Sequence, residues 1–98
     1  MVIVTKTTLS EYAKKHSASA EPLNYWYSIV SKADWSNLAD LRKDFNNVDF
    51  VGNDRYAFNI KGNSFRLVAM IHFDIRTLYI RCIGTHAEYD KIKNIDKI

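Results

Sequence analysis

Hydrophobic residues recur first at helical spacing and later at strand spacing, and this change divides the chain into two parts. Val2 to Val4 is a short β-branched run that predicts a buried strand. Between residues 7 and 45 the apolar positions recur every three or four residues, which predicts two or three helices. From Arg55 onward apolar and polar residues alternate, which is typical of strands. The pattern therefore predicts a strand, then helices, then a group of strands.

Three apolar stripes define the helical part. The first helix follows three possible N-cap residues, Thr7, Thr8 and Ser10. The second is expected to start near Glu21-Pro22, because proline is favoured in a first turn. Ser36 is expected to cap a third, shorter helix. The stripes are Leu9, Tyr12, Ala13 and His16, then Leu23, Trp26, Val30 and Ala33, then Leu38, Leu41 and Phe45.

The strand part predicts a three-strand meander, at Arg55 to Lys61, Ser64 to Phe73 and Thr77 to Gly84. Segment 48–54 has no clear periodicity and is expected to be a loop with a short extended piece at most. Thr85 is expected to cap a short helix over 86–92, and the tail 93–98 to be frayed. The order of elements predicts a single domain over residues 1–98 of the α+β class, with helices packed on one face of an antiparallel sheet.

The dipeptide Gly62-Asn63 is a hairpin signal and predicts a two-residue turn between the first two strands of the meander. Side chains alternate across a strand, so one face of this hairpin is wholly apolar. The opposite face, called the open face below, carries two positive charges and no acid, a combination suited to holding a phosphate. The predicted pairs are Lys61 with Ser64, Ile60 with Phe65, Asn59 with Arg66, and Phe58 with Leu67.

A second two-residue turn at Ile75-Arg76 would extend both faces onto the third strand. It places Arg66 opposite Thr85, puts Cys82 on the core face, and puts Arg81 with Ile83 on the open face. A register one residue different would expose Leu78 and Ile80 and bury Arg81, so it is rejected.

Composition and charge exclude some classes of protein but do not identify one. The 98 residues are 47% hydrophobic with a net charge of +3 and a pI near 9.0, which is compatible with an anionic partner. No apolar run is long enough to cross a membrane and no signal-peptide layout begins the chain, so a cytoplasmic protein is expected. The single Cys82 excludes an internal disulfide and is expected in the core. The histidines are too scattered to predict a zinc site, and no cofactor is expected.

The residues gathered near the open face suit metal-free cleavage of RNA by its own 2′-hydroxyl. This reaction needs a base, an acid and cations that stabilise the phosphorane. His86 and Tyr89 lie three residues apart on one helical face, and the predicted register brings them near Arg66. The candidate catalytic residues are His86, Tyr89, Arg66, Lys61 and Arg81, and the candidate RNA-binding residues are Asn59, Lys61, Arg66 and Arg81.

Each of these residues also has a purely structural interpretation. Lys61 beside a turn is ordinarily solvated, His86 can serve at a helix start, and Tyr89 can pack against the sheet edge. Convergence on one face, more than any single residue, favours a functional interpretation.

Several segments together resemble the HigB-type toxins of the RelE superfamily of bacterial toxin–antitoxin systems. The likeness covers nearly the whole chain, and the Gly-Thr-His-Ala-Glu-Tyr-Asp stretch with the Asn-Ile-Lys-Gly-Asn hairpin is its most specific part. The segments are Ala33–Trp35, Phe50–Asn53, Phe58–Asn63, Phe65–Val68 and Ile83–Ile92.

The resemblance implies a RelE-like fold and a small endoribonuclease that cuts mRNA in the ribosomal A site. It implies a HigA-like helix-turn-helix antitoxin, with operator DNA bound only through the antitoxin complex. Carried over to this chain, Lys61, Arg66 and Arg81 would stabilise phosphate, while His86 would act as general acid or base. Tyr89 would position the 2′-hydroxyl or stack on a nucleotide.

His86 stands where other members carry a basic residue, so its role as acid or as base stays open. Two alternatives on the same fold stay open as well: a module that binds RNA without cutting it, and a toxin directed at a protein such as DNA gyrase.

Overall fold

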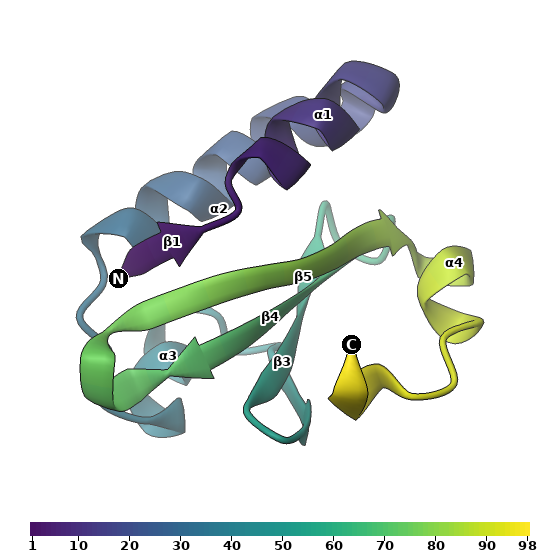
Figure 1. The fold of residues 1–98 in the computed structure, drawn as a ribbon. Helices are drawn as coiled ribbons and strands as arrows, with labels where there is room; N and C mark the ends of the chain where they lie inside the picture. The colour runs from purple at the N-terminus through teal and green to yellow at the C-terminus, as the bar shows by residue number, and fades with distance from the viewer.

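The computed structural model describes residues 1–98 and contains one mixed sheet with helices on both of its faces (Figure 1). No helix is long and apolar enough to span a membrane. The elements in chain order are β1 (Val2–Val4), α1 (Thr7–Lys15), η1 (Ser17–Ser19), α2 (Ala20–Lys32), α3 (Leu38–Asp44), β2 (Asp49–Gly52), β3 (Arg55–Ile60), β4 (Phe65–His72), η2 (Phe73–Ile75), β5 (Thr77–Thr85), α4 (His86–Asp90) and η3 (Ile95–Lys97).

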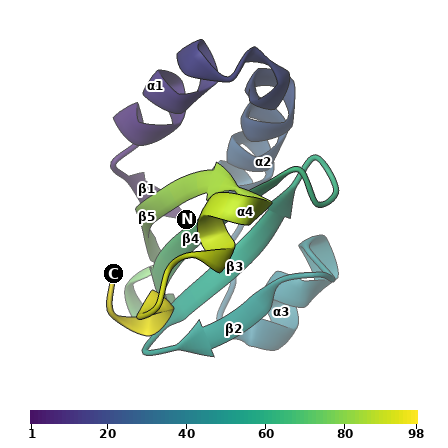
Figure 2. The ribbon, with the colours of Figure 1, turned by 90° about the vertical axis from the view of Figure 1, so that its right-hand side faces the viewer.

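The sheet has the strand order β1-β5-β4-β3-β2, which confirms the predicted α+β class. The meander β3-β4-β5 is antiparallel as predicted, while β1 joins its edge parallel to β5. The segment expected to be mostly loop supplies the fifth strand, β2, which pairs with β3. The helices α1 and α2 lie over one face, and α4 with the C-terminal segment lies over the other (Figures 1 and 2).

The core lies between α1, α2 and α3 and the apolar face of the sheet, and the predicted stripes build it. Trp26 is buried and meets Phe58 edge to face at 5.4 Å between ring centroids. Phe45, the residue that follows α3, packs on the Phe58 ring with 5.2 Å between centroids. Such aromatic contacts add to the stabilisation that burial alone provides. Trp35 is also buried, and its indole N–H donates to Asp44.

The helix starts confirm one predicted cap and correct two others. Thr85 caps α4 in a capping box, in which the Thr85 side chain accepts from the Glu88 N–H and the Glu88 carboxylate accepts from the Thr85 N–H. The cap of α3 is Asn37, because its side-chain oxygen accepts from the Asp40 N–H, so the expectation for Ser36 is wrong. The N-cap residue of α1 is Lys6, which provides no side-chain cap, so Thr7, Thr8 and Ser10 are not N-caps.

The hairpin of β3 and β4 has the predicted register but a longer turn. Asn59 pairs with Arg66 and Ile60 with Phe65, which leaves the turn to Lys61–Ser64. Lys61 and Gly62 both have left-handed backbone conformations, with φ of 53° and 62°. Because Lys61 is left-handed, it leaves the strand alternation. Lys61 and Ser64 still face each other across the turn, where the Ser64 N–H donates to the Lys61 carbonyl at 3.1 Å, but they lie outside the strand ladder, which ends at Ile60 and Phe65.

The register between β4 and β5 also differs from the prediction. His72 pairs with Thr77, so the connection contains four residues, ending in Arg76 with φ of 50°. Val68 pairs with Cys82 while the adjacent Ala69 pairs with Ile80, which leaves Arg81 as the extra residue of a β-bulge. A bulge inverts the alternation beyond it, so Cys82 lies on the open face, opposite Val68, and Ile83 packs against the core. The predicted faces of Cys82 and Ile83 are therefore wrong.

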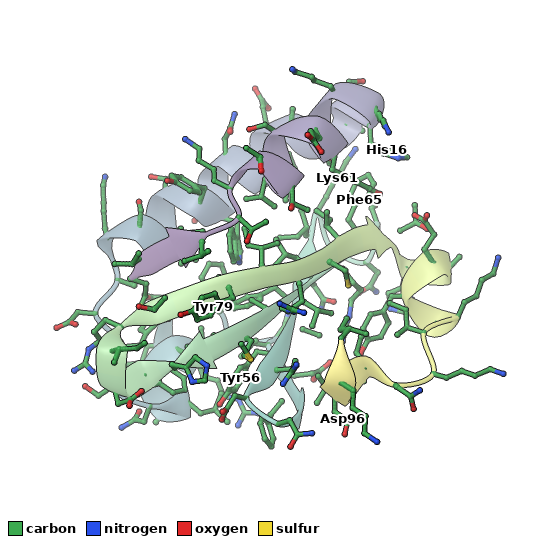
Figure 3. The ribbon with its side chains drawn as sticks, viewed as in Figure 1. His16, Tyr56, Lys61, Phe65, Tyr79 and Asp96 are labelled. Carbon is green, nitrogen blue, oxygen red and sulfur yellow. The ribbon has the colours of Figure 1, made fainter.

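The C-terminal segment is ordered on the sheet, and its predicted fraying is wrong. Its 3₁₀ helix η3 packs against β2, and Asp96 lies beside that strand (Figure 3). Gly52 allows this approach, because a Cβ there would lie 3.2 Å from the Cβ of Asp96.

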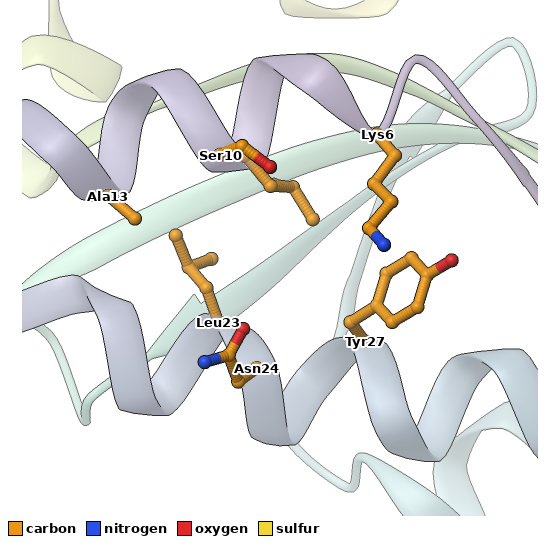
Figure 4. Close-up of a pocket in the computed structure, with 7 residues that line it drawn as sticks. Lys6, Ser10, Ala13, Leu23, Asn24 and Tyr27 are labelled. Carbon is orange, nitrogen blue, oxygen red and sulfur yellow. The ribbon is translucent and has the colours of Figure 1, made fainter.

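A separate cavity lies between α1 and α2 on the helical side of the sheet (Figure 4). The Lys6 ammonium stands 4.6 Å from the Tyr27 ring centroid there, a cation–π contact that joins the start of α1 to α2. This cavity contains none of the predicted site residues.

Candidate functional site

Arg66 lies at the centre of the candidate site, on β4 in the middle of the sheet. Its side chain lies on the open face and the residue is only 7% exposed. Nη1 donates to Oδ1 of Asn59 at 2.6 Å, and Nη2 donates to Oδ2 of Asp49 at 2.8 Å. The remaining Nε–H is buried without a partner. The predicted contact between Asn59 and Arg66 is therefore present, because the two residues are paired across β3 and β4.

Asp49 corrects the expectation that this face carries no acid. It enters from β2, where it pairs with Ala57 on β3, and reaches across to Arg66. Burial opposes the charge of the guanidinium, but its contacts with Asp49 and Tyr89 outweigh that effect and raise the pKa of Arg66. Arg66 is consequently a permanent cation whose charge is already compensated. Asp49 was not predicted on this face because segment 48–54 has no clear periodicity.

Tyr89 and His86 reach the same region from α4. The Thr85 cap starts this helix directly at the end of β5, whose Gly84 pairs with Arg66. The guanidinium carbon of Arg66 lies 4.6 Å from the Tyr89 ring centroid, and the ring of His86 lies 6.2 Å from that of Tyr89. The cation–π contact holds the side chains of Arg66 and Tyr89 in place. The structure therefore brings together Asn59, Arg66, Tyr89 and His86.

His86 has an acidic partner on its own helix. Its Nδ1 lies 3.3 Å from Oδ2 of Asp90, one helical turn further on. With the proton on Nδ1, the imidazole donates to Asp90 and leaves Nε2 able to accept a proton. The His86 side chain is 42% exposed, so this nitrogen can meet a substrate. Asp90 was not predicted, although its spacing of four residues from His86 is a recognisable helical signal.

Lys61 and Arg81 make no hydrogen bond or ion pair with these four residues. Lys61 stands at the exposed hairpin turn and lines a groove with Glu21, Pro22 and Tyr25 of α2. Asn59 borders the same groove. Arg81 lies on the bulge, and its Nε donates to the main-chain oxygen of Ile98 at 3.0 Å.

Cys82 borders the site through the inverted face of β5. It lines a small cavity with Arg66, Gly84 and Tyr89. Burial raises the pKa of its thiol, although a backbone hydrogen bond at Val68 and the charge of Arg81 act in the opposite direction. The thiol is therefore protonated near neutral pH and is a poor nucleophile.

His72 occupies the far end of the open face. Its Nδ1 lies 3.9 Å from Oδ2 of Asp54, and its ring meets Tyr79 edge to face at 5.7 Å. It belongs to the same face but not to the group around Arg66, so it serves as a reference histidine below.

The arrangement around Arg66 combines a fixed cation, an imidazole with an acidic partner, and a phenol. These are groups that stabilise a charged phosphate, exchange protons near neutral pH, and contact a nucleotide. We call Asp49, Asn59, Arg66, His86, Tyr89 and Asp90 the Arg66 cluster.

Residues 19–92 match the family described as HigB_toxin, the RelE-like toxic component of a toxin-antitoxin system. The chain is 32% identical over 94 residues to a protein of Escherichia coli O6:H1 named mRNA interferase HigB, covering 94% of this chain and 91% of that protein. It is 33% identical over 92 residues to the mRNA interferase toxin HigB of Escherichia coli K12, covering 92% and 88% of the two chains. A protein of Shigella flexneri named mRNA interferase HigB matches with the same identity and coverage.

Proposed function

Because this chain belongs to the HigB family of RelE-like toxins of toxin–antitoxin systems, we propose that it is a ribosome-dependent mRNA endonuclease. Cleavage by the 2′-hydroxyl of the substrate, without a metal ion, would inhibit translation and growth. The observation that carries the proposal is the placement of Arg66 against Tyr89, with His86 on the same short helix. The names of the curated relatives, mRNA interferases, support the same reaction.

The proposed reaction transfers two protons and exchanges one phosphorus–oxygen bond. A base removes the proton of the 2′-hydroxyl, and its oxygen attacks the adjacent phosphorus. The bond to the 5′-oxygen breaks, and an acid protonates that leaving oxygen, which yields a 2′,3′-cyclic phosphate and a 5′-hydroxyl end. His86 exchanges one of these protons through Nε2, because Asp90 holds Nδ1. Tyr89 positions the 2′-hydroxyl or stacks on the nucleotide.

Arg66 stabilises the extra negative charge of the phosphorane in this scheme. Its guanidinium is buried and its Nη2 donates to Asp49, so the phosphate competes with that carboxylate for Nη2. Asn59 keeps hold of Nη1 and orients the group. Arg81 and Lys61 contribute charge further along the RNA backbone, from the bulge of β5 and from the hairpin turn.

The partners follow from the family. We propose a HigA-like helix-turn-helix antitoxin that neutralises the toxin, with mRNA on the ribosome as substrate, in the cytoplasm. Operator DNA would be bound only through the complex with the antitoxin.

The test is to induce the wild type, His86→Ala and His72→Ala in a bacterial host and to map mRNA 5′ ends on translating ribosomes. His72→Ala is a matched control, because it removes a histidine from the same face at a distance from the Arg66 cluster. We expect new in-frame cuts with the wild type and His72→Ala, and none with His86→Ala. Folding of each purified variant is checked by circular dichroism, and cleavage in vitro is repeated with a chelator.

Each result has a definite meaning. Growth arrest without new 5′ ends would overturn the nuclease and direct attention to a protein target such as gyrase. RNA binding without cleavage under any condition would make the chain a non-catalytic RNA-binding module. Cuts that persist in His86→Ala would keep the nuclease and remove His86 from its chemistry. Loss of cleavage with the chelator would contradict the metal-free reaction.

A further inference from the structure

One aromatic side chain on the surface has no partner within the protein. Tyr25 of α2 is 68% exposed, more than any other aromatic residue of the chain. Every other Trp, Tyr and Phe side chain lies against another ring or, for Tyr27, against the Lys6 ammonium. An exposed ring without a partner is suited to stacking on a nucleobase, because every base has a flat π-face.

Tyr25 borders a groove of about 480 Å³ between α2 and the end of β3. This volume lies within the range of about 300–1,000 Å³ that is usual for ligand sites. Pro22 of α2, Phe45 and Ile60 give the groove apolar walls. The groove can therefore cover the faces of a flat, largely apolar group such as a base.

The groove is open because the sheet narrows beside it. β2 pairs with β3 only as far as Ala57, so the last residues of β3 have a neighbouring strand on one side alone. Asn59 belongs to this stretch and borders the groove, and its side-chain oxygen accepts from Nη1 of Arg66 at 2.6 Å. The groove therefore begins at the residue that orients the proposed phosphate site.

Polar groups in the groove also suit a nucleotide. Lys61 supplies a cation for a phosphate, and Glu21 is the one acid among the lining residues. The indole N–H of Trp26, which forms part of the wall, is buried without an acceptor. An unsatisfied donor costs free energy, and bases carry carbonyl and ring-nitrogen acceptors that suit such a donor.

We propose that this groove holds the base of an RNA nucleotide next to the bond that is cut. Tyr25 is the stacking platform, and Lys61 binds a phosphate of the same strand. The proposal rests on the proposed function, since it takes RNA as the ligand. A phosphate at Arg66 and a base in the groove lie on the two sides of Asn59, so the RNA crosses the edge of β3. A peptide strand could also pair with this edge, but the free ring, the cation and the continuity with Arg66 favour RNA.

The test measures binding of a short fluorescein-labelled 2′-O-methyl oligoribonucleotide, which cannot be cleaved by its own 2′-hydroxyl, by anisotropy over a range of salt concentrations. We expect Tyr25→Ala to weaken binding about fivefold or more, the loss of one base–aromatic stack. Tyr25→Phe keeps the ring and should retain most of the affinity. The matched control is Phe50→Ala, which removes an exposed aromatic ring that lies outside the groove and should leave binding unchanged.

The salt dependence separates stacking from phosphate binding. Lys61→Gln should reduce the slope of log K against log salt by about 0.7, the contribution of one single-strand phosphate contact. Tyr25→Ala should leave this slope unchanged, because stacking releases no counterions. Lys32→Gln is the control for charge, since Lys32 is an exposed lysine at the opposite end of α2, and its slope should equal that of the wild type.

An abasic scan identifies the nucleotide that occupies the groove. Each base of the oligoribonucleotide is removed in turn, and one position should weaken binding to the wild type more than the others. Removal of that same base should have little effect on binding to Tyr25→Ala, because the ring that it contacts is already absent. Circular dichroism checks that each variant is folded.

Equal affinities of Tyr25→Ala and the wild type would overturn the base site, and so would an equal loss in Phe50→Ala. A weakening by Tyr25→Ala that is the same for every abasic oligoribonucleotide would also overturn it, because no single base would then depend on the ring. If Tyr25→Ala left RNA binding intact but prevented neutralisation by a co-expressed antitoxin, the groove would be a protein-binding surface and the RNA site would be wrong.

The outcome is independent of the cleavage assay above. Tyr25-dependent binding of one base without any cleavage would contradict the proposed nuclease but keep this site. Cleavage by the wild type without Tyr25-dependent binding would keep the nuclease and remove the site.

Discussion

Asp49 and Arg66 belong to strands β2 and β4, and their side chains meet across β3 with 2.8 Å between Oδ2 and Nη2. This contact ties the edge of the sheet to a buried cation at its centre. It also places the acid in competition with any phosphate that approaches Arg66. The pair is therefore expected to stabilise the folded domain and, at the same time, to weaken the binding of phosphate to Arg66.

Replacing Asp49 with Asn should separate these two effects. The buried guanidinium loses its counter-charge, and we expect the free energy of unfolding to fall by about 1–2 kcal/mol. The estimate is below that for a fully buried pair because the Asp49 side chain is 59% exposed and therefore screened by solvent. Binding of the 2′-O-methyl oligoribonucleotide should tighten, because Arg66 is then available. Urea unfolding and fluorescence anisotropy measure the two quantities.

The control is Asp74→Asn, which makes the same charge change at an exposed position of η2. It should alter neither quantity appreciably. Weaker RNA binding by a folded Asp49→Asn variant would contradict competition and would give Asp49 a role in binding.

Replacing Asp90 with Ala should reduce the rate of cleavage and leave substrate binding nearly unchanged. Asp90 acts through His86, whose Nδ1 it faces at 3.3 Å, and is therefore a positioning residue. The loss in kcat should stay within the roughly 10²–10⁴-fold that a whole general acid–base group contributes. Kinetics of cleavage give kcat and KM separately, and Asp90→Glu should recover part of the rate.

The matched change is Asp54→Asn, which alters the acid beside the reference histidine His72. The kcat of Asp54→Asn should equal that of the wild type. Equal rates for Asp90→Ala and the wild type would remove the His86–Asp90 pair from the reaction.

The thiol of Cys82 should react slowly with iodoacetamide in the folded protein. Burial raises its pKa, so the reactive thiolate is scarce near neutral pH and increases only as the pH rises toward that value. The measurement is the alkylation rate against pH by mass spectrometry, with the urea-unfolded chain as control. A folded rate equal to the unfolded rate would show that the small cavity beside Arg66 and Tyr89 does not shield this residue.

The Glu88 carboxylate should make the stability of the domain dependent on acid pH. Hydrogen bonding with Thr85 lowers the pKa of Glu88 below the ordinary 4.5. A lowered pKa in the folded state means that the stabilisation is complete above the unfolded value and is lost as the pH falls through the folded value. We expect Glu88→Gln to be less stable than the wild type at neutral pH, with the difference closing at acid pH. Urea unfolding at several pH values measures this.

Glu11→Gln is the control, since Glu11 is an exposed acid of α1 whose side chain makes no hydrogen bond or ion pair. Its difference from the wild type should not vary with pH. If the difference in free energy of unfolding between Glu88→Gln and the wild type also stayed constant with pH, the Glu88 carboxylate would not stabilise α4 through the capping box. His86 and Tyr89 would then be held in place by other contacts.

Much of the candidate site could be predicted from local sequence. The pairing of Asn59 with Arg66 followed from a short hairpin, since a turn between adjacent strands determines which residues face each other. The position of His86 and Tyr89 near Arg66 followed from a capped helix directly after β5, even though the predicted register was in error. Both relationships depend on neighbours in the chain.

The tertiary structure alone decided which further groups reach the open face. The bulge at Arg81 inverts β5 and moves Cys82 beside Arg66, Asp49 compensates that arginine from β2, and the tail reaches Arg55. Periodicity depends only on how residues repeat within one segment, so the sequence by itself determined the helices, the meander and the register of the hairpin between β3 and β4. A bulge, an edge strand and a folded tail are stabilised by contacts between segments that are distant in the sequence. Such contacts leave no periodic pattern along the chain, so only the tertiary structure reveals them.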